Sequence, residues 1–350
     1  MADFVIGKIP VGNNAAPLVV AEIGANHDGD VKKAELMLRQ VAATGAKAVK
    51  FQTYTAEELV ADSQRFINWG PPGKEQKERI GEVFKRLTLP REAHADIFQL
   101  ARELGLEVFS TPFSEDGVDF LMTLDVPCFK VAASDVNHLP MLRHIARTGK
   151  PVLLSLGKCT LSEADTAITT LFENGCQELC IMHCISQYPS PMEEMNLRVI
   201  PTLATLYPEC VIGFSDHSLG ITAPIAAVAL GARVIEKHVT LNQDDFGPDH
   251  WFSLNMEQLQ GLVNGVNEAY VALGHPRKRV VACENHERKT SVRSLVLRHP
   301  VTAGHQLQPE DLKIVRPGGG ITPEFLDVVV GMKVSSDLAE NTVLQWEMFK

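Results

Sequence analysis

The stretch RVIEKHVT (residues 233–240) begins as a buried strand and ends in polar chemistry. Val234 and Ile235 suit a strand of a parallel sheet that is packed on both faces. Glu236, Lys237 and His238 then follow while the pattern is still extended, although polar groups are costly to bury without partners. Residues two apart in a strand point the same way, so Glu236 and His238 are expected on one face of the sheet.

Eight apolar runs of this kind recur along the chain, separated by helical patterns. They are LVVAEIG (18–24), AVKFQTY (48–54), EVFSTPF (107–113), CFKVAA (128–133), PVLLSLG (151–157), ELCIMHC (178–184), VIGFSDH (211–217) and RVIEKHVT (233–240). Strands that alternate with helices predict a parallel sheet. Eight such units in about 250 residues are typical of the closed (β/α)8 TIM barrel, an α/β fold. A doubly wound open sheet is the alternative, but no GxGxxG motif follows an early strand, which counts against its dinucleotide-binding form.

Three of the helical patterns have clear ends. VKKAELMLRQVAATG (31–45) has apolar residues at helical spacing and Gly45 placed to end the helix. TLSE (160–163) is typical of a capping box that opens a helix running towards Leu171. MEQLQGLVNGVNEAYVALG (256–274) follows the eighth run and stops at Gly274.

After Gly274 the sequence changes character, and we expect three parts: a barrel domain (1–275), a linker (276–293) and a small β-rich domain (294–350). The segment after Gly274 is charged and has little periodicity. Short β-type runs then follow between Gly and Pro turns, namely SLVLRHPV, KIVRP, VVVGMKV and TVLQW. A module of this size is near the limit at which a domain can hold its own core, so we expect it to lean on another surface.

The composition excludes some partners and points to a compartment. The formal net charge of −10 disfavours nucleic acid or an anionic membrane as a partner, and it means that an anionic substrate needs a local cationic pocket. The first residues match neither a signal peptide nor a membrane span. Seven cysteines without paired short spacings are typical of reduced thiols in a cytoplasmic protein. A metal flanked by Cys180 and Cys184 is the alternative.

Polar side chains stand near the ends of most of the runs, where barrel enzymes place their catalytic groups. They are Glu22, Asn26, Lys50, Gln52, Thr111, Lys130, Ser155, His217 and His238. A single strand-end histidine is more often structural, but neighbouring strands lie about 4.8 Å apart, so His217 and His238 could share one divalent cation. Glu236 is placed to orient His238, and Asp249 is a further neighbour of the metal or substrate. Two imidazoles suit an open Mn²⁺-type site better than a closed zinc site.

Lys50 and Lys130 lie in apolar strand sequence, where an unpaired ammonium would be costly. Structural ion pairs with Glu22 or Asp135 are one interpretation. The other is that both lysines face a polyanionic substrate. Lys130 could instead form a Schiff base, as in lysine aldolases, although a metal and an imine rarely serve the same carbonyl.

Several segments resemble, in order and spacing, the sialic acid synthase family, which makes N-acetylneuraminate and related nonulosonates such as legionaminic and pseudaminic acids. They are AEIGANHDGD, AVKFQTY, STPF, FKVAASDVNHLP, GKPVLLSLGK, HCISQYPSP, GFSDHSLG, ALGARVIEKHVTL and FGPDHWFSL. The tail SLVLRHPVTAGHQLQPEDLKIVRPGGGI is similar to the antifreeze-like (SAF) domain, of β-clip type, that ends those enzymes. The resemblance covers essentially the whole chain.

The resemblance implies a transferase that condenses phosphoenolpyruvate with an N-acetylmannosamine-type aldose, its 6-phosphate or a diamino-trideoxy analogue. The products are a nine-carbon 2-keto acid and phosphate. His217 and His238 are the implied metal ligands, with Mn²⁺ expected and Mg²⁺ or Co²⁺ as alternatives. The residues implied to bind phosphoenolpyruvate are Lys50, Gln52, Thr111, Lys130, Ser155 and Ser186. The implied catalytic residues are Lys50 and Lys130 together with Glu22 and Asp135, which would handle protons. The residues implied to bind the sugar are Tyr188, Asp249 and Arg316. Arg316 is expected to reach the partner's site in a domain-swapped homodimer, its alternative being a solvated turn residue.

The chain departs from the family pattern where Ala133 stands in place of a serine, Asp135 in place of a glutamate, and Leu156 and Lys158 in place of Thr and Met. Lys158 either adds charge to the pocket or lies on the surface. The segment RFINWGPPGKEQ (65–76) is expected to form a loop on the substrate side. Three other functions stay open: a barrel that condenses phosphoenolpyruvate with another aldose, a metal aldolase that uses pyruvate, and a non-enzymatic carbohydrate-binding or ice-interacting protein.

Overall fold

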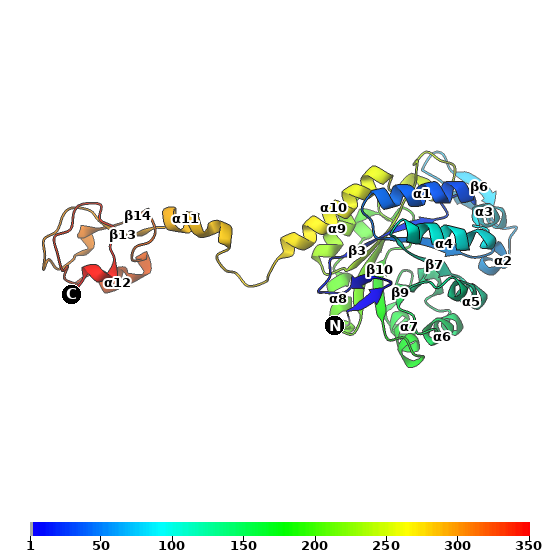
Figure 1. Ribbon diagram of the computed structural model, residues 1–350, viewed down its shortest axis with the longest axis horizontal. Helices are drawn as coiled ribbons and strands as arrows, with labels where there is room; N and C mark the ends of the chain where they lie inside the picture. Colours follow the sequence, from blue (N-terminus) through cyan, green and yellow to red (C-terminus); the bar gives the residue numbers. More distant parts are fainter. Residues whose placement is uncertain (1–2) are drawn as a thin grey trace. The chain divides into compact units, whose positions relative to one another are not determined.

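The computed structural model describes residues 3–350 (Figure 1). The chain divides into two compact units, Met1–Gly274 and His275–Lys350. Among the described residues, no helix is both long and apolar enough to cross a membrane.

The first unit is a closed barrel of eight strands in the order β10-β11-β12-β3-β4-β7-β8-β9. All neighbouring pairs are parallel, so the (β/α)8 prediction is confirmed and the open-sheet alternative is wrong. The strands are β3 (Leu18–Gly24), β4 (Ala48–Thr53), β7 (Glu107–Pro112), β8 (Phe129–Val131), β9 (Val152–Ser155), β10 (Leu179–Cys184), β11 (Val211–Asp216) and β12 (Val234–His238). Each of the eight predicted runs contains one of them.

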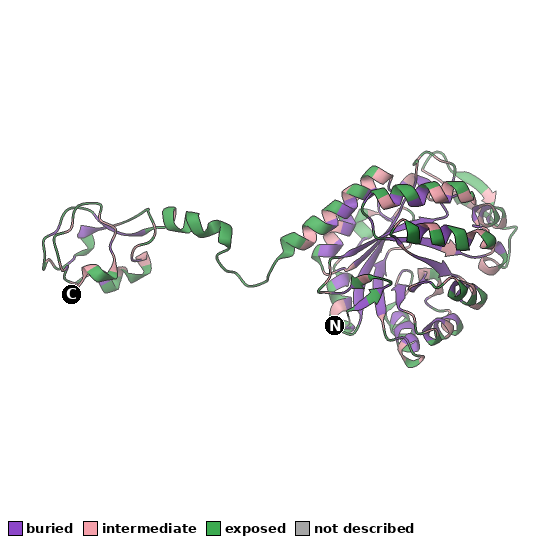
Figure 2. Cartoon of the chain, viewed as in Figure 1, coloured by how far each residue is buried: buried purple, intermediate pink, exposed green. Residues whose placement is uncertain are grey.

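Helices surround the barrel, and Figure 2 shows the strands buried within their ring. They are α1 (Val31–Ala43), α2 (Ala56–Leu59), α3 (Ile80–Leu87), α4 (His94–Glu103), α5 (Glu115–Thr123), α6 (Leu139–Arg147), α7 (Leu161–Glu173), α8 (Val199–Leu206), α9 (Thr222–Ala229) and α10 (Met256–Leu273). The capping box at the start of α7 is confirmed: Thr160 N donates to Glu163 Oε2 at 2.7 Å, and Glu163 N donates to Thr160 Oγ1 at 3.3 Å. Helix α10 ends before Gly274, whose φ of 53° lies in the left-handed region.

Two antiparallel hairpins were not predicted from the sequence. One is β1 (Phe4–Ile6) with β2 (Ile9–Val11) near the start of the chain. The other is β5 (Phe66–Trp69) with β6 (Gln76–Arg79), inserted between β4 and α3. The second hairpin occupies most of the segment that we expect on the substrate side.

The second unit has a core of its own around the antiparallel pair β13 (Ser294–Leu297) and β14 (Leu312–Val315). Its buried side chains are Leu295, Leu297, Val301, Leu307, Leu312, Ile321, Val329, Val334 and Leu344. Two short helices differ from expectation. Helix α11 (Asn285–Thr290) lies within the range predicted as linker, and α12 (Leu326–Val329) overlaps the run predicted as β-type, VVVGMKV. Periodicity does not separate strand from helix in so short an apolar run.

Candidate active site

The carboxyl ends of the barrel strands converge on a small polar cavity of about 60 Å³. Each of the eight strands contributes at least one lining residue. In the order of the chain these are Glu22, Lys50, Thr111, Lys130, Ser155, Cys184, Ser215 and His238. Gln52, Phe113, Ala132, Ala133, Tyr188, His217 and Glu236 complete the lining. This is the end of the barrel where enzymes of the fold carry their chemistry.

Two lysines and two glutamates form the floor of this cavity. Lys50 Nζ lies 2.9 Å from Glu22 Oε1 and donates to Thr111 Oγ1 at 2.9 Å. Lys130 Nζ donates to Ser155 Oγ at 2.7 Å and to the Val131 carbonyl at 3.0 Å. Glu236 Oε1 lies 3.9 Å from both ammonium groups. We call Glu22, Lys50, Lys130 and Glu236 the charge lattice.

The charge lattice is closed to solvent, and burial, opposed by Glu236, lowers the pKa of Lys130. Burial alone would lower the pKa of Lys50, but Glu22 and Glu236 outweigh it and hold that pKa above its ordinary value. Burial would raise the pKa of Glu236, but the two lysines outweigh it and lower that pKa. For Glu22 burial dominates over Lys50, and its pKa is raised. The second carboxylate oxygens, Glu22 Oε2 and Glu236 Oε2, are buried with no hydrogen-bond partner among the described residues. The lattice therefore offers two acceptor atoms to a ligand or water.

These contacts answer two questions that the sequence leaves open. The ion pair between Lys50 and Glu22 exists, and it lies in the cavity, so structural pairing and a place in the site are compatible. Lys130 has Glu236, not Asp135, as its ion-pair partner. Asp135 lies in the turn after β8 and accepts a hydrogen bond from Ser134 Oγ at 3.1 Å.

The imidazoles of His217 and His238 lie side by side, with ring centroids 5.4 Å apart. Strands β11 and β12 pair in register up to Asp216 and Lys237, which brings the next residue of each strand together. His217 Nδ1 lies 3.0 Å from the Ile185 carbonyl, which can only accept, so Nδ1 carries the proton and Nε2 keeps a free lone pair. His238 Nδ1 is buried, has no hydrogen-bond partner within residues 3–350, and lies 3.6 Å from Asp249 Oδ2.

Burial keeps both rings neutral: it lowers the pKa of His217 to about 4 and that of His238 well below its ordinary value. Neutral imidazoles are the form that binds metals, and a buried nitrogen without a partner is unfavourable unless a ligand or water satisfies it. The donor set therefore fits a divalent cation. Glu236, which we expect from the sequence to orient His238, instead accepts a hydrogen bond from Ser215 Oγ at 3.0 Å.

An ion pair between Lys237 and Asp216 also joins the ends of β11 and β12. Lys237 Nζ lies 2.6 Å from Asp216 Oδ2, and both side chains are at most 1% exposed. Lys237 also donates to the Ser218 carbonyl, and Ser218 N donates to Asp216 Oδ1 at 2.8 Å. The backbone on both sides of His217 is thus tied to the residue before His238.

The remaining predicted residues lie around this centre or in the other unit. Gln52 Nε2 donates to Glu22 Oε1 at 2.8 Å. Tyr188 is 44% exposed as a residue, and its ring centroid is 4.3 Å from that of His217. Burial raises the pKa of Asp249 to about 7. Arg316 is an exposed residue of the unit His275–Lys350.

Of the four departures from the family pattern, Ala133 lines the cavity, whereas Asp135, Leu156 and Lys158 are not among its lining residues. A Cβ added at Gly157 would lie 3.0 Å from Ala133 Cβ and 3.1 Å from Cys184 Sγ, and it would collide with Ser186 Oγ. The Ser186 hydroxyl therefore lies over Gly157, next to Ala133, where the resemblance to the family implies a serine. Leu156 packs against the barrel core, and Lys158 is exposed with a φ of 58°. The exposure of Lys158 agrees with the interpretation that it lies on the surface, and not with the interpretation that it adds charge to the pocket.

Sequence reasoning did not assign four lining residues to this site, namely Phe113, Ala132, Cys184 and Ser215, although it named Cys184 as an alternative metal ligand. Ser215 lies two residues before His217 in the same extended run, so the two-residue period placed it on the cavity face. Cys184 ends β10, a position that the alternation along ELCIMHC does not single out.

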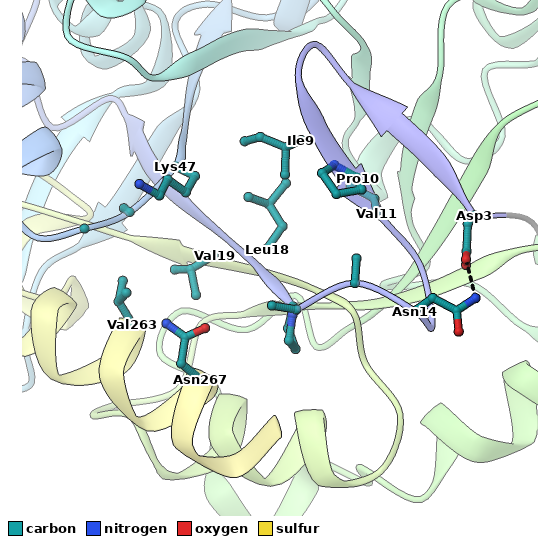
Figure 3. Close-up of a pocket in the computed structure, with 15 residues that line it drawn as sticks. Asp3, Ile9, Pro10, Val11, Asn14, Leu18, Val19, Lys47, Val263 and Asn267 are labelled. Carbon is teal, nitrogen blue, oxygen red and sulfur yellow. Dashed lines mark hydrogen bonds between the residues drawn. The ribbon is translucent and has the colours of Figure 1, made fainter. Parts of the chain in front are cut away.

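The barrel unit has a cluster of potential metal ligands and a second cavity away from this centre. Asp28, Asp245 and His250 bring metal-type ligand atoms together, but Lys33 Nζ lies 2.6 Å from both carboxylates and fills the cluster. A larger cavity, of about 370 Å³, lies at the amino ends of the strands between the β1–β2 hairpin, β3 and α10 (Figure 3). Ile9, Pro10, Val11, Leu18, Val19 and Val263 give it a largely apolar wall.

Comparison with known proteins gives a family match for each part of the chain. Residues 37–278 match the model of the NeuB family, and residues 292–350 match the model of the SAF domain. The N,N'-diacetyllegionaminic acid synthase of Legionella pneumophila is 36% identical over 345 residues, with 97% of each chain covered. The pseudaminic acid synthase of Helicobacter pylori is 34% identical over 330 residues, covering 94% of this chain and 96% of that protein.

A solved structure agrees with these matches. The N-acetylneuraminic acid synthetase of Leptospira borgpetersenii, crystallised with citrate, superposes with a TM-score of 0.75 at 30% identity. The alignment covers 82% of this chain and 95% of that chain.

Proposed function

Because the chain belongs to the NeuB family and is therefore an enzyme related to the legionaminic and pseudaminic acid synthases, we propose that it condenses phosphoenolpyruvate with an N-acylated amino-aldose. The acceptor is of N-acetylmannosamine type, its 6-phosphate or a diamino-trideoxy analogue. The products are a nine-carbon 2-keto acid and inorganic phosphate.

The observation that carries this proposal is the charge lattice beside two neutral imidazoles. A chain of net charge −10 repels an anion as a whole, yet it buries the ammonium groups of Lys50 and Lys130 in one cavity. Both ammonium groups are paired with glutamates, and together with the hydroxyls of Thr111 and Ser155 they bring several hydrogen-bond donors to one cavity, which suits the phosphate and carboxylate of phosphoenolpyruvate. A carbohydrate-binding protein without catalysis leaves this arrangement unexplained.

In the proposed reaction, Lys50, Lys130, Thr111 and Ser155 bind phosphoenolpyruvate, with Gln52 and Ser186 beside them. C3 of the bound enol phosphate attacks the aldehyde carbon, and the aldehyde oxygen takes up a proton to become a hydroxyl. A water molecule then loses a proton as it adds at C2 of the resulting oxocarbenium ion. The tetrahedral intermediate then collapses and releases phosphate. The fixed ammonium groups stabilise negative charge on the phosphate and carboxylate throughout. Glu22, with its raised pKa, and Asp135 handle the protons of the sugar hydroxyls.

We propose that His217 and His238 hold a divalent cation, Mn²⁺ with Mg²⁺ or Co²⁺ as alternatives. When bound, it supplies Lewis-acid polarisation of the acceptor aldehyde. Tyr188 and Asp249 bind the sugar, and Arg316 of a partner subunit reaches its N-acyl group in a domain-swapped homodimer. The seven cysteines are free, and we place the enzyme in the cytoplasm.

The test is phosphate release from phosphoenolpyruvate with a panel of N-acylated aldoses and their 6-phosphates, in Mn²⁺ and after chelation. We expect turnover with at least one acceptor, lost in chelator and restored by the metal. Pyruvate offered in place of phosphoenolpyruvate separates a metal aldolase from the proposed synthase. No turnover across a broad aldose panel would refute the function.

The metal assignment has its own test in His217→Ala and His238→Ala. Each variant should abolish turnover and weaken Mn²⁺ binding at least a hundredfold, because half of the protein's donor set is gone. Mn²⁺ binding is measured by titration without substrate, and circular dichroism checks the fold. Wild-type activity in either variant contradicts the assignment.

A further inference from the structure

The loop that joins β12 to α10, residues 239–255, carries Asp249 to the side of His238. We call it the Asp249 loop. Its base is closed by backbone bonds, since Leu254 N donates to the His238 carbonyl at 2.9 Å and Thr240 N donates to the Leu254 carbonyl at 2.8 Å. These bonds fix where the loop begins and ends. They do not fix where its middle points.

Asn26, in the turn after β3, ties the two sides of the loop together through its side chain. It is 1% exposed, and its Nδ2 donates both to the Val239 carbonyl and to Ser253 Oγ, each at 2.9 Å. Both hydrogens of the amide are thus used inside the protein. A buried amide with two bonds to one loop holds that loop against the barrel, and none of its contacts reaches the cavity lining.

Ser253 passes this constraint to Asp249. Its Oγ accepts from Asn26 and donates to the Asp249 carbonyl at 2.6 Å. A hydroxyl that accepts one bond and donates the other has its hydrogen fixed in direction. The path from Asn26 to Asp249 is therefore two hydrogen bonds long, and it ends on the residue whose carboxylate lies 3.6 Å from His238 Nδ1.

The same turn holds the loop at a second place. His250 is 0% exposed, with Nε2 3.1 Å from Asp28 Oδ1 and Nδ1 2.6 Å from Thr240 Oγ1. Lys33 joins Asp28 to Asp245, near the middle of the loop. These ties keep the loop as a whole in place, whereas the Asn26–Ser253 path acts on the backbone of Asp249 itself.

We propose that Asn26, acting through Ser253, is a positioning residue that sets the Asp249 carboxylate for the acceptor sugar. This rests on the proposed function, in which Asp249 binds the sugar. Displacing a binding group by about 1 Å costs about 10²-fold when geometry controls the reaction. Asn26 contacts neither the residues proposed to bind phosphoenolpyruvate nor the imidazoles of His217 and His238, so its removal should affect binding of the acceptor more than binding of phosphoenolpyruvate.

The test compares Asn26→Ala, Ser253→Ala and the double variant with the wild-type enzyme. Each single variant loses hydrogen bonds worth about 1 kcal/mol each, and we expect the KM for the acceptor to rise about tenfold. The KM for phosphoenolpyruvate should change less than twofold. The double variant should be no worse than Asn26→Ala, because the two residues act in one path. Asn242→Ala is the matched control: it removes an exposed side chain of the same loop, bonded to Asp245 at 3.1 Å.

Hydrogen exchange of residues 239–255 supplies a readout that does not depend on turnover. Both single variants should speed exchange in the Asp249 loop, and Asn242→Ala should not speed it around Asp249. Equal rises in both KM values, additive effects in the double variant, or unchanged exchange would each overturn the proposal. If the wild-type enzyme turns over no acceptor, the proposed function fails. The exchange data then still decide whether Asn26 holds the loop.

Discussion

Each charge in the cavity floor depends on the other three. Lys50, Lys130 and Glu236 have side chains at most 5% exposed, and Glu22 is as deeply buried. Removing one member leaves an uncompensated buried charge, which costs about 3–5 kcal/mol where it has been measured. Such a buried cluster is not needed for stability alone, since apolar residues of similar volume often give the folded protein equal or greater stability. Its composition is better explained by the ligand.

Lys130→Met tests the anion-binding role at the scale of one residue. The change removes the ammonium that donates to Ser155 and faces Glu236. A hydrogen bond to a charged group contributes about 1.5–3 kcal/mol, so we expect phosphoenolpyruvate affinity to fall by about 10²-fold. Calorimetric titration with phosphoenolpyruvate measures it without turnover. Lys150→Met, which removes a surface lysine paired with Asp125, is the control. Affinity within twofold of wild type would contradict the role.

The sequence predicts which residues face the cavity better than it predicts which of them touch. Strand parity places Glu236 and His238 on one face, and they do share it. The alternation of side chains along one strand does not predict distances between side chains of different strands. Because barrel strands are tilted, residues of different strands come to lie in one layer of the barrel interior. Glu236 therefore meets Lys50 and Lys130 from other strands, not His238, its neighbour along the strand.

At the scale of elements, the sequence predicts the strands that are buried on both faces, and it does not predict the strands that are buried on one face or exposed. The barrel strands are apolar throughout because helices and the barrel interior cover both faces. The β6 strand reads Gln-Lys-Glu-Arg and is exposed for most of its length, so no apolar run marks it. Its pairing with β5 depends on contacts that hydrophobic periodicity cannot reveal.

One such contact joins the β5–β6 hairpin to the Asp249 loop. The rings of Trp69 and Phe246 meet edge to face at 4.9 Å, and the Arg86 guanidinium lies 5.0 Å from the centre of the Phe246 ring. Glu78 Oε2 accepts from both Trp69 Nε1, at 2.8 Å, and Arg86, at 2.9 Å. The β5–β6 hairpin and the Asp249 loop are therefore in direct contact through Trp69, Arg86 and Phe246.

Trp69→Ala should separate the two. Aromatic pairs contribute about 0.5–1.5 kcal/mol beyond their burial, so we expect hydrogen exchange to rise in residues 66–79 and around Phe246. The barrel strands should stay protected. Phe66→Ala is the matched control, because that half-exposed ring contacts Lys77 and Arg79 of its own hairpin. Unchanged exchange around Phe246 in Trp69→Ala would show that the contact does not hold the hairpin and the loop together.

At the scale of the whole molecule, each unit has its own buried interior, as the purple residues of Figure 2 show. The expectation that the small domain leans on another surface stays a prediction, and its test is the oligomeric state in solution. The barrel unit also buries several imidazoles away from the cavity, and these couple its stability to pH.

His27 is the clearest of these. It is 1% exposed, and its Nδ1 accepts a hydrogen bond from Gly29 N at 3.0 Å, so this nitrogen carries no proton in the folded chain. Burial lowers the pKa of His27 from 6.5 to about 4, although Asp28 acts in the opposite direction. At pH values between these two pKa values, His27 is largely protonated in the unfolded chain and largely neutral in the folded chain. The free energy of unfolding must therefore fall as the pH falls through this window.

His27 alone should lower the free energy of unfolding by about 2 kcal/mol between pH 7 and pH 5, since one pKa unit is about 1.4 kcal/mol. Urea denaturation at several pH values measures the slope. His27→Asn keeps an acceptor for Gly29 N but does not titrate, so its slope should be shallower, whatever its stability at pH 7. If His27→Asn keeps the wild-type slope, protonation occurs elsewhere, and the buried neutral state of His27 is not what makes this barrel sensitive to acid.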